Sequence, residues 1–348
     1  MKKLILMALA LLISFGVFAT DAPNISPYAD SGWTKVETDF NYSDVANVTV
    51  MDVWMPSGSG LNPSPNPNKP GVIFFHPGAW TSGDKSSFHN QAEYLASKGM
   101  VTFSINYQLA LVSKITDPPS LFDGTQTPYR AWTDAEKAIR YIRAHAAKYG
   151  INPSHLAVSG GSAGGHLAAA LATSTPTTTW VNGVSSSADI RPNALILFNP
   201  VLNLNTYTPW DTAWTAKDSI NPLIQLNETL PNTIIFQGDN DNVASYTVAN
   251  NFMKCATQTV INLTGDALVC QNNMASITKA PNVTLVDYVD RPHGFYNDGQ
   301  TGGGAVIING VGTPSTIIES NKTVLVGAGN DYIDVLKKTW LFIEALNW

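Results

Sequence analysis

Charged side chains are scarce in this sequence, and their scarcity narrows the classes of partner. Asp, Glu, Lys and Arg make up 13% of the 348 residues, against about a quarter in an average protein. The formal net charge is −6, and no cluster of basic residues stands out. Binding to nucleic acid or to an anionic membrane depends on such clusters. We therefore expect neither as a partner.

Long apolar runs are also missing. The apolar run over residues 4–18 follows Lys2-Lys3 and is shorter than the roughly 20 residues of a membrane span. With the small residue Ala19 at its end, this pattern predicts a signal peptide over residues 1–19 and a secreted or periplasmic protein that has no membrane contact after cleavage. An uncleaved anchor is the alternative.

Cysteine is nearly absent, and no constellation of metal ligands is recognisable. The two cysteines, Cys255 and Cys270, lie close in the sequence. In an exported protein this favours a disulfide between them, which would stabilise the fold by about 3 kcal/mol. A zinc site would need more ligands at tighter spacing. We expect neither a metal nor any other cofactor.

The remaining residues, 20–348, are predicted to form a single α/β domain. Continuous apolar runs predict buried strands, and segments with helical periodicity or a helix stop signal alternate with them, which indicates a mainly parallel sheet covered by helices on both faces. Residues 20–47 are expected to be irregular. The expected strands are 48–56, 72–75, 101–105, a short strand that begins at Leu156, 194–198, 233–236 and 283–289. The expected helices are 88–97, 129–149, an Ala-rich helix that begins just after Ser162, and 331–346.

Two segments are predicted to be insertions. Residues 203–231 are rich in aromatic residues and proline, and they fall between two strands at the edge where ligands bind in such sheets. They are expected to cap the site. Residues 299–330 contain three consecutive glycines and short β-like runs, so a surface hairpin is expected there.

The sequence Gly160-Gly161-Ser162-Ala163-Gly164 contains the pattern G-x-S-x-G between a predicted strand and a predicted helix. In that setting the serine occupies a sharp turn that exposes its hydroxyl above the sheet, and small neighbours are needed because backbone segments pass close by. A flexible glycine-rich loop is the alternative interpretation. The order of strand, turn and helix favours a nucleophilic serine.

A serine nucleophile needs a histidine base and a carboxylate that orients the base. Among the six histidines, His293 follows the last predicted parallel strand and would lie over the carboxyl ends of the strands. Asp239 and Asp241 both follow the strand 233–236, and the residues alone do not choose between them. The order of serine, aspartate and histidine is that of α/β-hydrolase triads.

The oxyanion of the reaction needs N–H donors as well. Backbone N–H groups after the strand that ends at Phe75, together with the N–H of Ala163, are in the expected place. Pro77 has no N–H. The predicted donors are therefore Gly78, Ala79 and Ala163.

Taken together, these motifs resemble the α/β-hydrolase esterases of the hormone-sensitive-lipase-like and carbohydrate-esterase-like groups. The similarity spans residues 48–298 and the last helix. It implies an α/β-hydrolase fold, Asp241 as the acid and a loop-shaping role for His76. The chain departs from the usual pattern at Pro77 and Ala79, where glycines are common, and at Gln108, where an arginine is common.

The sequence thus predicts a serine ester hydrolase that forms an acyl-enzyme through Ser162, Asp241 and His293. Its predicted substrate is a small-molecule or polysaccharide ester. The predicted reaction removes acetyl or other short acyl groups from carbohydrate. Aromatic rings offer faces on which sugars stack, although these rings could equally belong to the core or the cap. The candidate substrate-binding residues are Trp80, Tyr107, Trp210 and Trp214.

Other functions are compatible with the same motifs. A general esterase for short-chain, feruloyl or lipid esters is the nearest alternative. An exopeptidase of the prolyl-oligopeptidase type shares the fold and the order of the triad, but it normally carries a large additional N-terminal domain. A binding protein on a hydrolase scaffold is disfavoured because all three triad residues are present.

Overall fold

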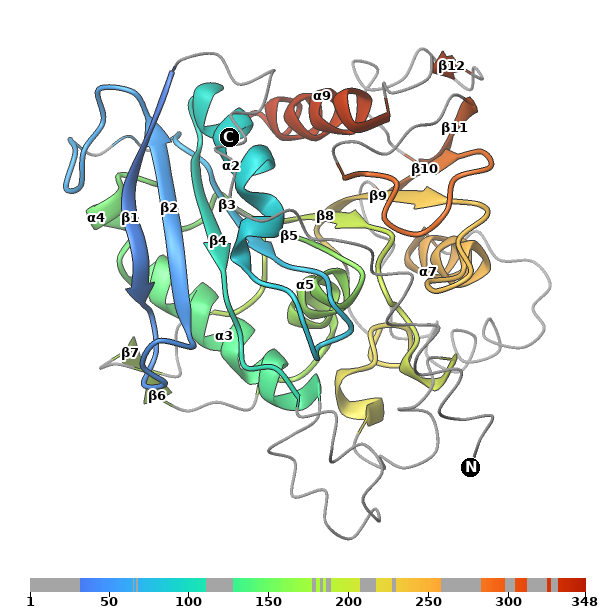
Figure 1. Ribbon diagram of the computed structural model, residues 1–348, viewed down its shortest axis with the longest axis horizontal. Coiled ribbons are helices and arrows are strands. Elements are labelled where there is room, and N and C mark those ends of the chain that lie inside the picture. The colour runs from blue at the N-terminus through green and yellow to red at the C-terminus, as the bar shows by residue number, and fades with distance from the viewer. Residues whose placement is uncertain are drawn as a thin grey trace, which may run out of the picture.

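A ten-stranded sheet forms the centre of the protein in the computed structural model (Figure 1). The structure describes residues 32–348 except 65, 67, 111–127, 177–179, 182–183, 186–188, 207–216, 227–229, 258–282, 298–303, 312–323 and 327–330. The strands of this sheet are β1 (Trp33–Asn41), β2 (Val50–Pro56), β3 (Gly71–Phe75), β4 (Val101–Ile105), β5 (Leu156–Gly161), β8 (Ala194–Phe198), β9 (Asn232–Gly238), β10 (Val283–Tyr288), β11 (Gly304–Val311) and β12 (Val324–Val326).

The strand order is β1-β2-β4-β3-β5-β8-β9-β10-β11-β12. The six strands from β4 to β10 in this order are parallel to one another, and the two strands at each end pair antiparallel. Parallel strands bring their carboxyl ends to one edge of the sheet. The segments that follow β3, β5, β8, β9 and β10 therefore meet at the same edge. A separate two-stranded sheet pairs β6 (Trp180–Val181) with β7 (Val184–Ser185).

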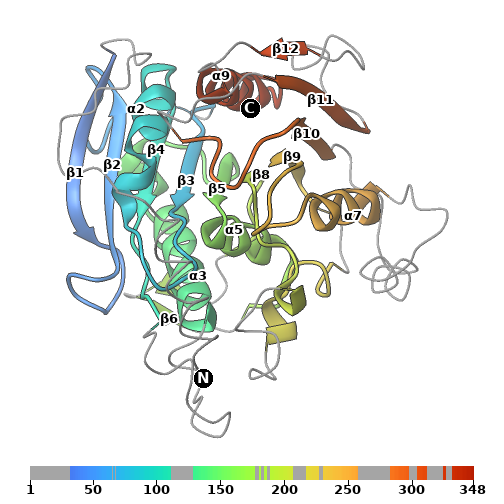
Figure 2. The ribbon, with the colours of Figure 1, turned by 45° about the vertical axis from the view of Figure 1, so that its right-hand side comes forward.

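Helices cover both faces of the sheet (Figure 2). The helices α3, α5 and α7 lie on one face and α2 and α9 on the other. Neighbouring residues of one strand pack into different cores, as Ile235 and Phe236 do, because strand side chains alternate between faces. The helices and helical turns are η1 (Lys85–Phe88), α2 (His89–Ser97), α3 (Pro128–Ala144), α4 (Ala146–Tyr149), α5 (Ala163–Thr173), η4 (Leu204–Thr206), η5 (Lys217–Ile220), α7 (Tyr246–Thr257) and α9 (Asp331–Glu344).

The predicted alternation of strands and helices is confirmed, with shifts at several ends. The helix expected over residues 129–149 is interrupted at His145, where α3 gives way to the short α4. Nδ1 of His145 lies 2.8 Å from the carbonyl oxygen of Tyr141, so the side chain competes for an oxygen of the last helical turn. Gly150 ends α4 with φ of 63°, the left-handed conformation in which glycine often ends a helix.

One expectation about the edges of the sheet is wrong, and a second is confirmed only in part. Residues 20–47 were expected to be irregular, but β1 pairs antiparallel with β2. As an edge strand it is only partly buried and its pairing contains two irregularities, which explains why its sequence lacks a clear apolar alternation. Residues 299–330 were expected to form a surface hairpin. Strands β11 and β12 of this range do pair antiparallel with each other. In addition, β11 pairs with β10 along six residue pairs, so the two strands extend the central sheet.

The predicted cap segment, 203–231, is described only in part. Its described residues include the helical turns η4 and η5, and the amide of Asn221 donates to Oδ1 of Asn203 at 3.0 Å to connect them. Residues 207–216 lie outside the described residues. The role of this segment as a cap stays a prediction. No helix among the described residues is long and apolar enough to span a bilayer.

Candidate active site

Ser162 lies at a sharp turn between β5 and α5. Its backbone has φ of 52° and ψ of −114°, a combination that costs a residue with a side chain about 1–3 kcal/mol and persists only where the surroundings enforce it. The N–H of Ser162 donates to Phe198 on the neighbouring strand at 3.0 Å, and its carbonyl oxygen accepts from His166 and Val201. The elbow predicted from G-x-S-x-G is present.

The glycines around Ser162 are needed for space. A methyl group at Gly160 would lie 2.4 Å from the backbone of Gly164, and one at Gly164 would lie 2.0 Å from the carbonyl oxygen of Phe75. At Gly161 it would lie 1.9 Å from the hydroxyl of Tyr296. All three distances are far below van der Waals contact. The turn is therefore closed tightly on itself and packed against two other parts of the chain, at Phe75 and Tyr296, and is not a flexible loop.

A hydrogen-bonded relay leads away from the serine hydroxyl. Oγ of Ser162 lies 2.9 Å from Nε2 of His293, and Nδ1 of His293 lies 2.8 Å from Oδ2 of Asp241. Ser162 and Asp241 are 5% and 7% exposed. These are the contacts by which a histidine takes a proton from a serine while a carboxylate fixes its tautomer. The structure brings together the three residues that the sequence placed in one triad.

The carboxylate of Asp241, and not that of Asp239, faces the histidine. Oδ1 of Asp241 accepts the backbone N–H groups of Val243 and Ala244, each at 2.8 Å. Asp239 instead accepts the N–H of Asp290 at 2.6 Å. The residues alone did not choose between Asp239 and Asp241. In the structure Asp241 is the aspartate that contacts His293, which agrees with the family resemblance.

Two buried polar residues in contact with the triad were not found from the sequence. The amide nitrogen of Asn199 lies 3.0 Å from Nδ1 and 3.3 Å from Nε2 of His293, and its oxygen accepts the N–H of Gly294 at 3.3 Å. The amide nitrogen of Gln237 donates to Oδ2 of Asp241 at 3.1 Å. Both follow or end an apolar strand, so a polar residue at that position was the available signal.

The loop after β3 has an unusual backbone. Gly78, Ala79 and Trp80 have φ of 126°, 53° and 61°, and the carbonyl oxygen of Gly78 accepts N–H groups from Thr81 and Ser82. Among the hydrogen bonds of the described residues, none uses the N–H of Gly78 or Ala79. The close approach of Gly164 to Phe75 puts this loop beside the start of α5. The roles of Gly78, Ala79 and Ala163 as oxyanion donors stay a prediction.

His76 and Tyr107 support this loop. Their rings stack with centroids 4.1 Å apart, and the hydroxyl of Tyr107 donates to the carbonyl oxygen of His76 at 2.8 Å. Burial lowers the pKa of His76 to about 4, so its imidazole is neutral at pH 7. The loop-shaping role implied for His76 fits these contacts.

The proposal that Trp80 and Tyr107 contact substrate requires correction, because both side chains are buried in the core. The ring of Trp80 meets that of His166 edge-on at 5.2 Å, and Nε2 of His166 bonds with the carbonyl oxygen of Ile220 at 2.8 Å. Burial also lowers the pKa of His166 to about 4. These two aromatic residues therefore position the loop and the helix that flank Ser162.

Three residues named from the sequence lie outside the described part of the chain. These are Trp210, Trp214 and Cys270. Cys255 is buried on α7, and its pairing with Cys270 stays a prediction. Within the described ranges, no group of three or more His, Cys, Asp or Glu side chains is arranged to hold a metal ion.

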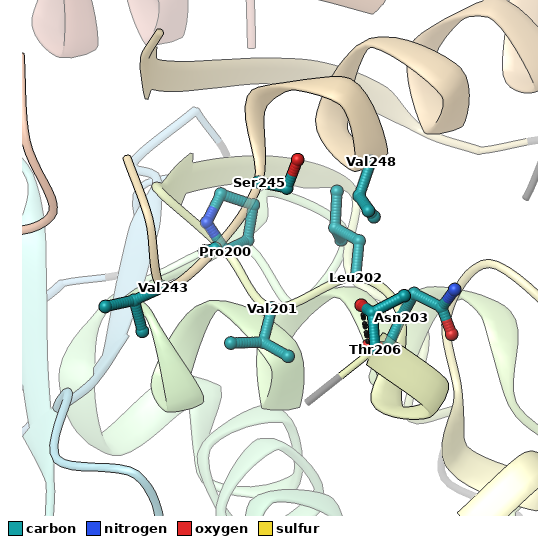
Figure 3. Close-up of a pocket in the computed structure, with 9 residues that line it drawn as sticks. Pro200, Val201, Leu202, Asn203, Thr206, Val243, Ser245 and Val248 are labelled. Carbon is teal, nitrogen blue, oxygen red and sulfur yellow. Dashed lines mark hydrogen bonds between the residues drawn. The ribbon is translucent and has the colours of Figure 1, made fainter. Parts of the chain in front are cut away.

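A small pocket lies between the segment after β8 and the segment that leads into α7 (Figure 3). Asn199 and Asp241, which contact His293, lie in the same two segments, but neither of them lines the pocket. Its lining is mostly aliphatic and consists of Pro200, Val201, Leu202, Asn203, Thr206, Val243, Ala244, Ser245 and Val248.

The sequence model of the BD-FAE family matches residues 51–255, more than half of the chain. This range contains Ser162 and Asp241. Among curated proteins, the chain is similar to the probable carboxylic ester hydrolase LipM of Mycobacterium tuberculosis, with 29% identity over 166 residues, 46% of this chain and 33% of that protein. It is also similar to an acetylxylan esterase of Xylanibacter ruminicola, with 28% identity over 34% of this chain and 19% of that protein. The chain spans about a third or less of the length of these relatives.

Solved structures share the fold over nearly the whole chain. Thermogutta terrifontis esterase 2, in a form phosphoramylated by tabun, superposes with a TM-score of 0.62 and 24% sequence identity. The superposition covers 91% of this chain and 95% of that protein. This likeness establishes the α/β-hydrolase fold that the motifs implied.

Proposed function

The chain belongs to the BD-FAE family, and from this premise we propose that it is a serine esterase that hydrolyses carboxylic esters through an acyl-enzyme. The observation that carries the proposal is the continuous relay from Ser162 through His293 to Asp241, with contacts of 2.9 and 2.8 Å. A carboxylic ester hydrolase and an acetylxylan esterase among the relatives support the same reaction.

In the first half of the reaction, Oγ of Ser162 attacks the ester carbonyl while Nε2 of His293 takes its proton. The carboxylate of Asp241 stabilises the imidazolium. N–H groups of Gly78, Ala79 and Ala163 bind the oxyanion. The imidazolium then returns the proton to the leaving alcohol as the carbon–oxygen bond of the ester breaks, which leaves the acyl group on Ser162.

In the second half, His293 takes a proton from water as the water oxygen attacks the acyl carbon. The bond from this carbon to Oγ breaks, the carboxylic acid leaves, and the proton returns to Ser162. None of these steps needs a cofactor. Both halves use the same donors and the same base.

The preferred substrates are esters of acetyl or other short acyl groups on carbohydrate. The named activity of the Xylanibacter relative supports this choice. The protein acts outside the cytoplasm, in the periplasm or the medium. The signal-like pattern of residues 1–19 is the support for that location.

The test is to measure acetate released from acetylated xylan together with hydrolysis of p-nitrophenyl acetate and p-nitrophenyl octanoate. The Ser162→Ala variant is the blank, and it should lose at least about a thousandfold in kcat/KM because the nucleophile is missing. Serine-dependent release of acetate with little activity on octanoate supports the carbohydrate substrate.

Activity on the nitrophenyl esters with none on xylan would contradict the carbohydrate substrate and leave a general carboxylesterase. Equal activity of the wild type and Ser162→Ala would contradict the esterase mechanism itself. Circular dichroism of the variant excludes unfolding as the cause of a loss.

A further inference from the structure

Gln237 is the penultimate residue of strand β9, and its side chain contacts Asp241, the acid of the triad. It is completely buried. Side chains alternate along a strand, so Gln237 lies on the same face of the sheet as Ile235, the face covered by α7. This position brings its amide under the turn that carries Asp241.

The amide nitrogen of Gln237 has three acceptors within reach. It lies 3.1 Å from Oδ2 of Asp241, 2.9 Å from the carbonyl oxygen of Ala244 and 3.1 Å from that of Gly238. The amide oxygen is buried and has no hydrogen-bond partner among the described residues. A flipped amide would put its oxygen against three other oxygens, so the nitrogen must face the carboxylate.

The two oxygens of Asp241 are held in different ways. Oδ1 accepts two backbone N–H groups, from Val243 and Ala244, within its own turn. Oδ2 is shared between His293 and Gln237. Gln237 is thus the one described side chain besides His293 that donates to this carboxylate, and it donates to the oxygen that faces the base.

We infer that Gln237 is a positioning residue of the triad, which holds Oδ2 of Asp241 in line with His293 and lowers the proton affinity of the aspartate–histidine pair. A dipole whose positive end points at a carboxylate favours the state in which the pair carries a negative charge. It therefore keeps His293 unprotonated and ready to act as a base at lower pH. This inference deepens the proposed function and rests on it for the kinetic readout alone.

Other titratable groups lie near the pair. Asp287 on β10 is in register with Gln237, and burial, followed by the nearby Asp239, raises its pKa to about 6. Burial and then Asp287 raise the pKa of Tyr246 at the start of α7 to about 12. Burial and then Asp241 raise the pKa of Tyr296. Among these groups, Asp287 has a pKa close to that of an ordinary histidine, so its titration would overlap with that of His293. The test therefore uses the Asp287→Asn background.

The segment that carries His293 contains two further charged residues. Arg291 forms an ion pair with Asp331 of α9, and the N–H of Asp290 donates to Asp239. The charge of Arg291 is thereby offset by its own partner. Neither residue has a described contact with Asp241.

The test follows the imidazole of His293 by NMR in protein labelled with ¹³C in the histidine rings. The comparison is between Gln237 and Gln237→Met, both in an Asp287→Asn background, and His293→Gln identifies the resonance. Methionine keeps the length of the side chain but removes the donor. We expect the titration midpoint of His293 to rise by about half a unit to one unit of pH.

Gln237→Glu is the second variant, and it carries the test if the methionine variant does not fold. A glutamate at this position adds a negative charge beside the pair, so the midpoint should rise further. Gln91→Met is the matched control, because Gln91 is also a buried glutamine but lies on α2. Its midpoint should equal that of the Asp287→Asn background.

The kinetic readout is the acid limb of the profile of kcat/KM against pH on p-nitrophenyl acetate, which should move in the same direction. An unchanged midpoint in both Gln237 variants overturns the inference even if kcat falls, because a purely structural residue would lower kcat without moving it. A shifted NMR midpoint in a protein that hydrolyses no ester would support the inference and contradict the proposed function.

Discussion

The nucleophile turn and the loop after β3 flank the same reaction centre, but they are held in different ways. Both contain residues with side chains at positive φ, namely Ser162 in the turn and Ala79 and Trp80 in the loop. The turn is fixed by glycines in its own sequence, which let backbone segments pass within atomic contact. The loop has local hydrogen bonds from Thr81 and Ser82 to Gly78, and it depends in addition on distant residues such as Tyr107, whose hydroxyl donates to the carbonyl oxygen of His76. Local and distant support should therefore respond differently to substitution.

The largest effect is expected from Gly164→Ala. The added methyl group would lie 2.0 Å from the carbonyl oxygen of Phe75, so α5 and the loop after β3 must move apart. We expect the free energy of unfolding to fall by about 3 kcal/mol and kcat/KM by about a hundredfold. Urea unfolding and ester hydrolysis measure the two effects.

The matched control is Gly60→Ala, because a methyl group at Gly60 would meet nothing within 4 Å. It should be nearly neutral in both measurements. If Gly164→Ala were as mild as Gly60→Ala, the close approach at the turn would not be a constraint, and the contrast between turn and loop would disappear.

The second-largest effect is expected to be a loss of stability at acidic pH. It comes from two buried histidines, His166 on α5 after the nucleophile turn and His76 in the loop after β3. Both have a pKa lowered by burial to about 4, below the value of about 6.5 in the unfolded chain. Between these values the unfolded chain binds more protons, so the free energy of unfolding falls as the pH falls through this window. Each histidine should contribute about 2 kcal/mol of loss at pH 5 relative to pH 8.

Urea unfolding at pH 8, 6.5 and 5 tests this with His76→Phe and His166→Phe, each of which should reduce the dependence on pH. Asp287 has the opposite effect on the pH dependence of stability. Its pKa is raised to about 6 in the folded state, so the free energy of unfolding falls as the pH rises through this value. Asp287→Asn should therefore raise stability at pH 8. An unchanged dependence in both histidine variants would show that burial does not lower the pKa of these imidazoles in the folded protein.

The smallest effect is expected from Tyr107→Phe. This change keeps the ring that stacks on His76 and removes the hydrogen bond to its carbonyl oxygen. We expect a loss of about 1 kcal/mol in stability and a decrease of a few fold in kcat. Tyr149→Phe is the control, since its hydroxyl donates to Glu37, which has no described contact with the triad. A similar decrease in kcat for both variants would mean that the loop does not depend on Tyr107.

The same contrast explains what the sequence could and could not predict. The turn at Ser162 could be predicted because the sequence pattern G-x-S-x-G and the close backbone contacts that require its glycines involve the same five residues. The parallel strands could be predicted because both of their faces are buried, which gives continuous apolar runs in the sequence. His293 was found from its place after the last of these strands.

Apart from the triad itself, interactions between distant residues could not be predicted from the sequence. The contacts of Asn199 and Gln237 with the triad depend on the arrangement of three loops at one edge of the sheet. Tyr107 and Trp80 were expected at the substrate, but an aromatic side chain is equally suited to a core, and only its surroundings decide. Edge strand β1 has polar positions on a half-exposed surface, so its periodicity is weak.

The position of the base after β10 also has a consequence for folding. Asp241 follows β9 and His293 follows β10, and these two strands pair along six residues in register. The relay can form only when β5, β9 and β10 are all in place in the sheet. Regain of ester hydrolysis during refolding therefore reports the complete assembly of these strands, and not merely the formation of local structure around Ser162.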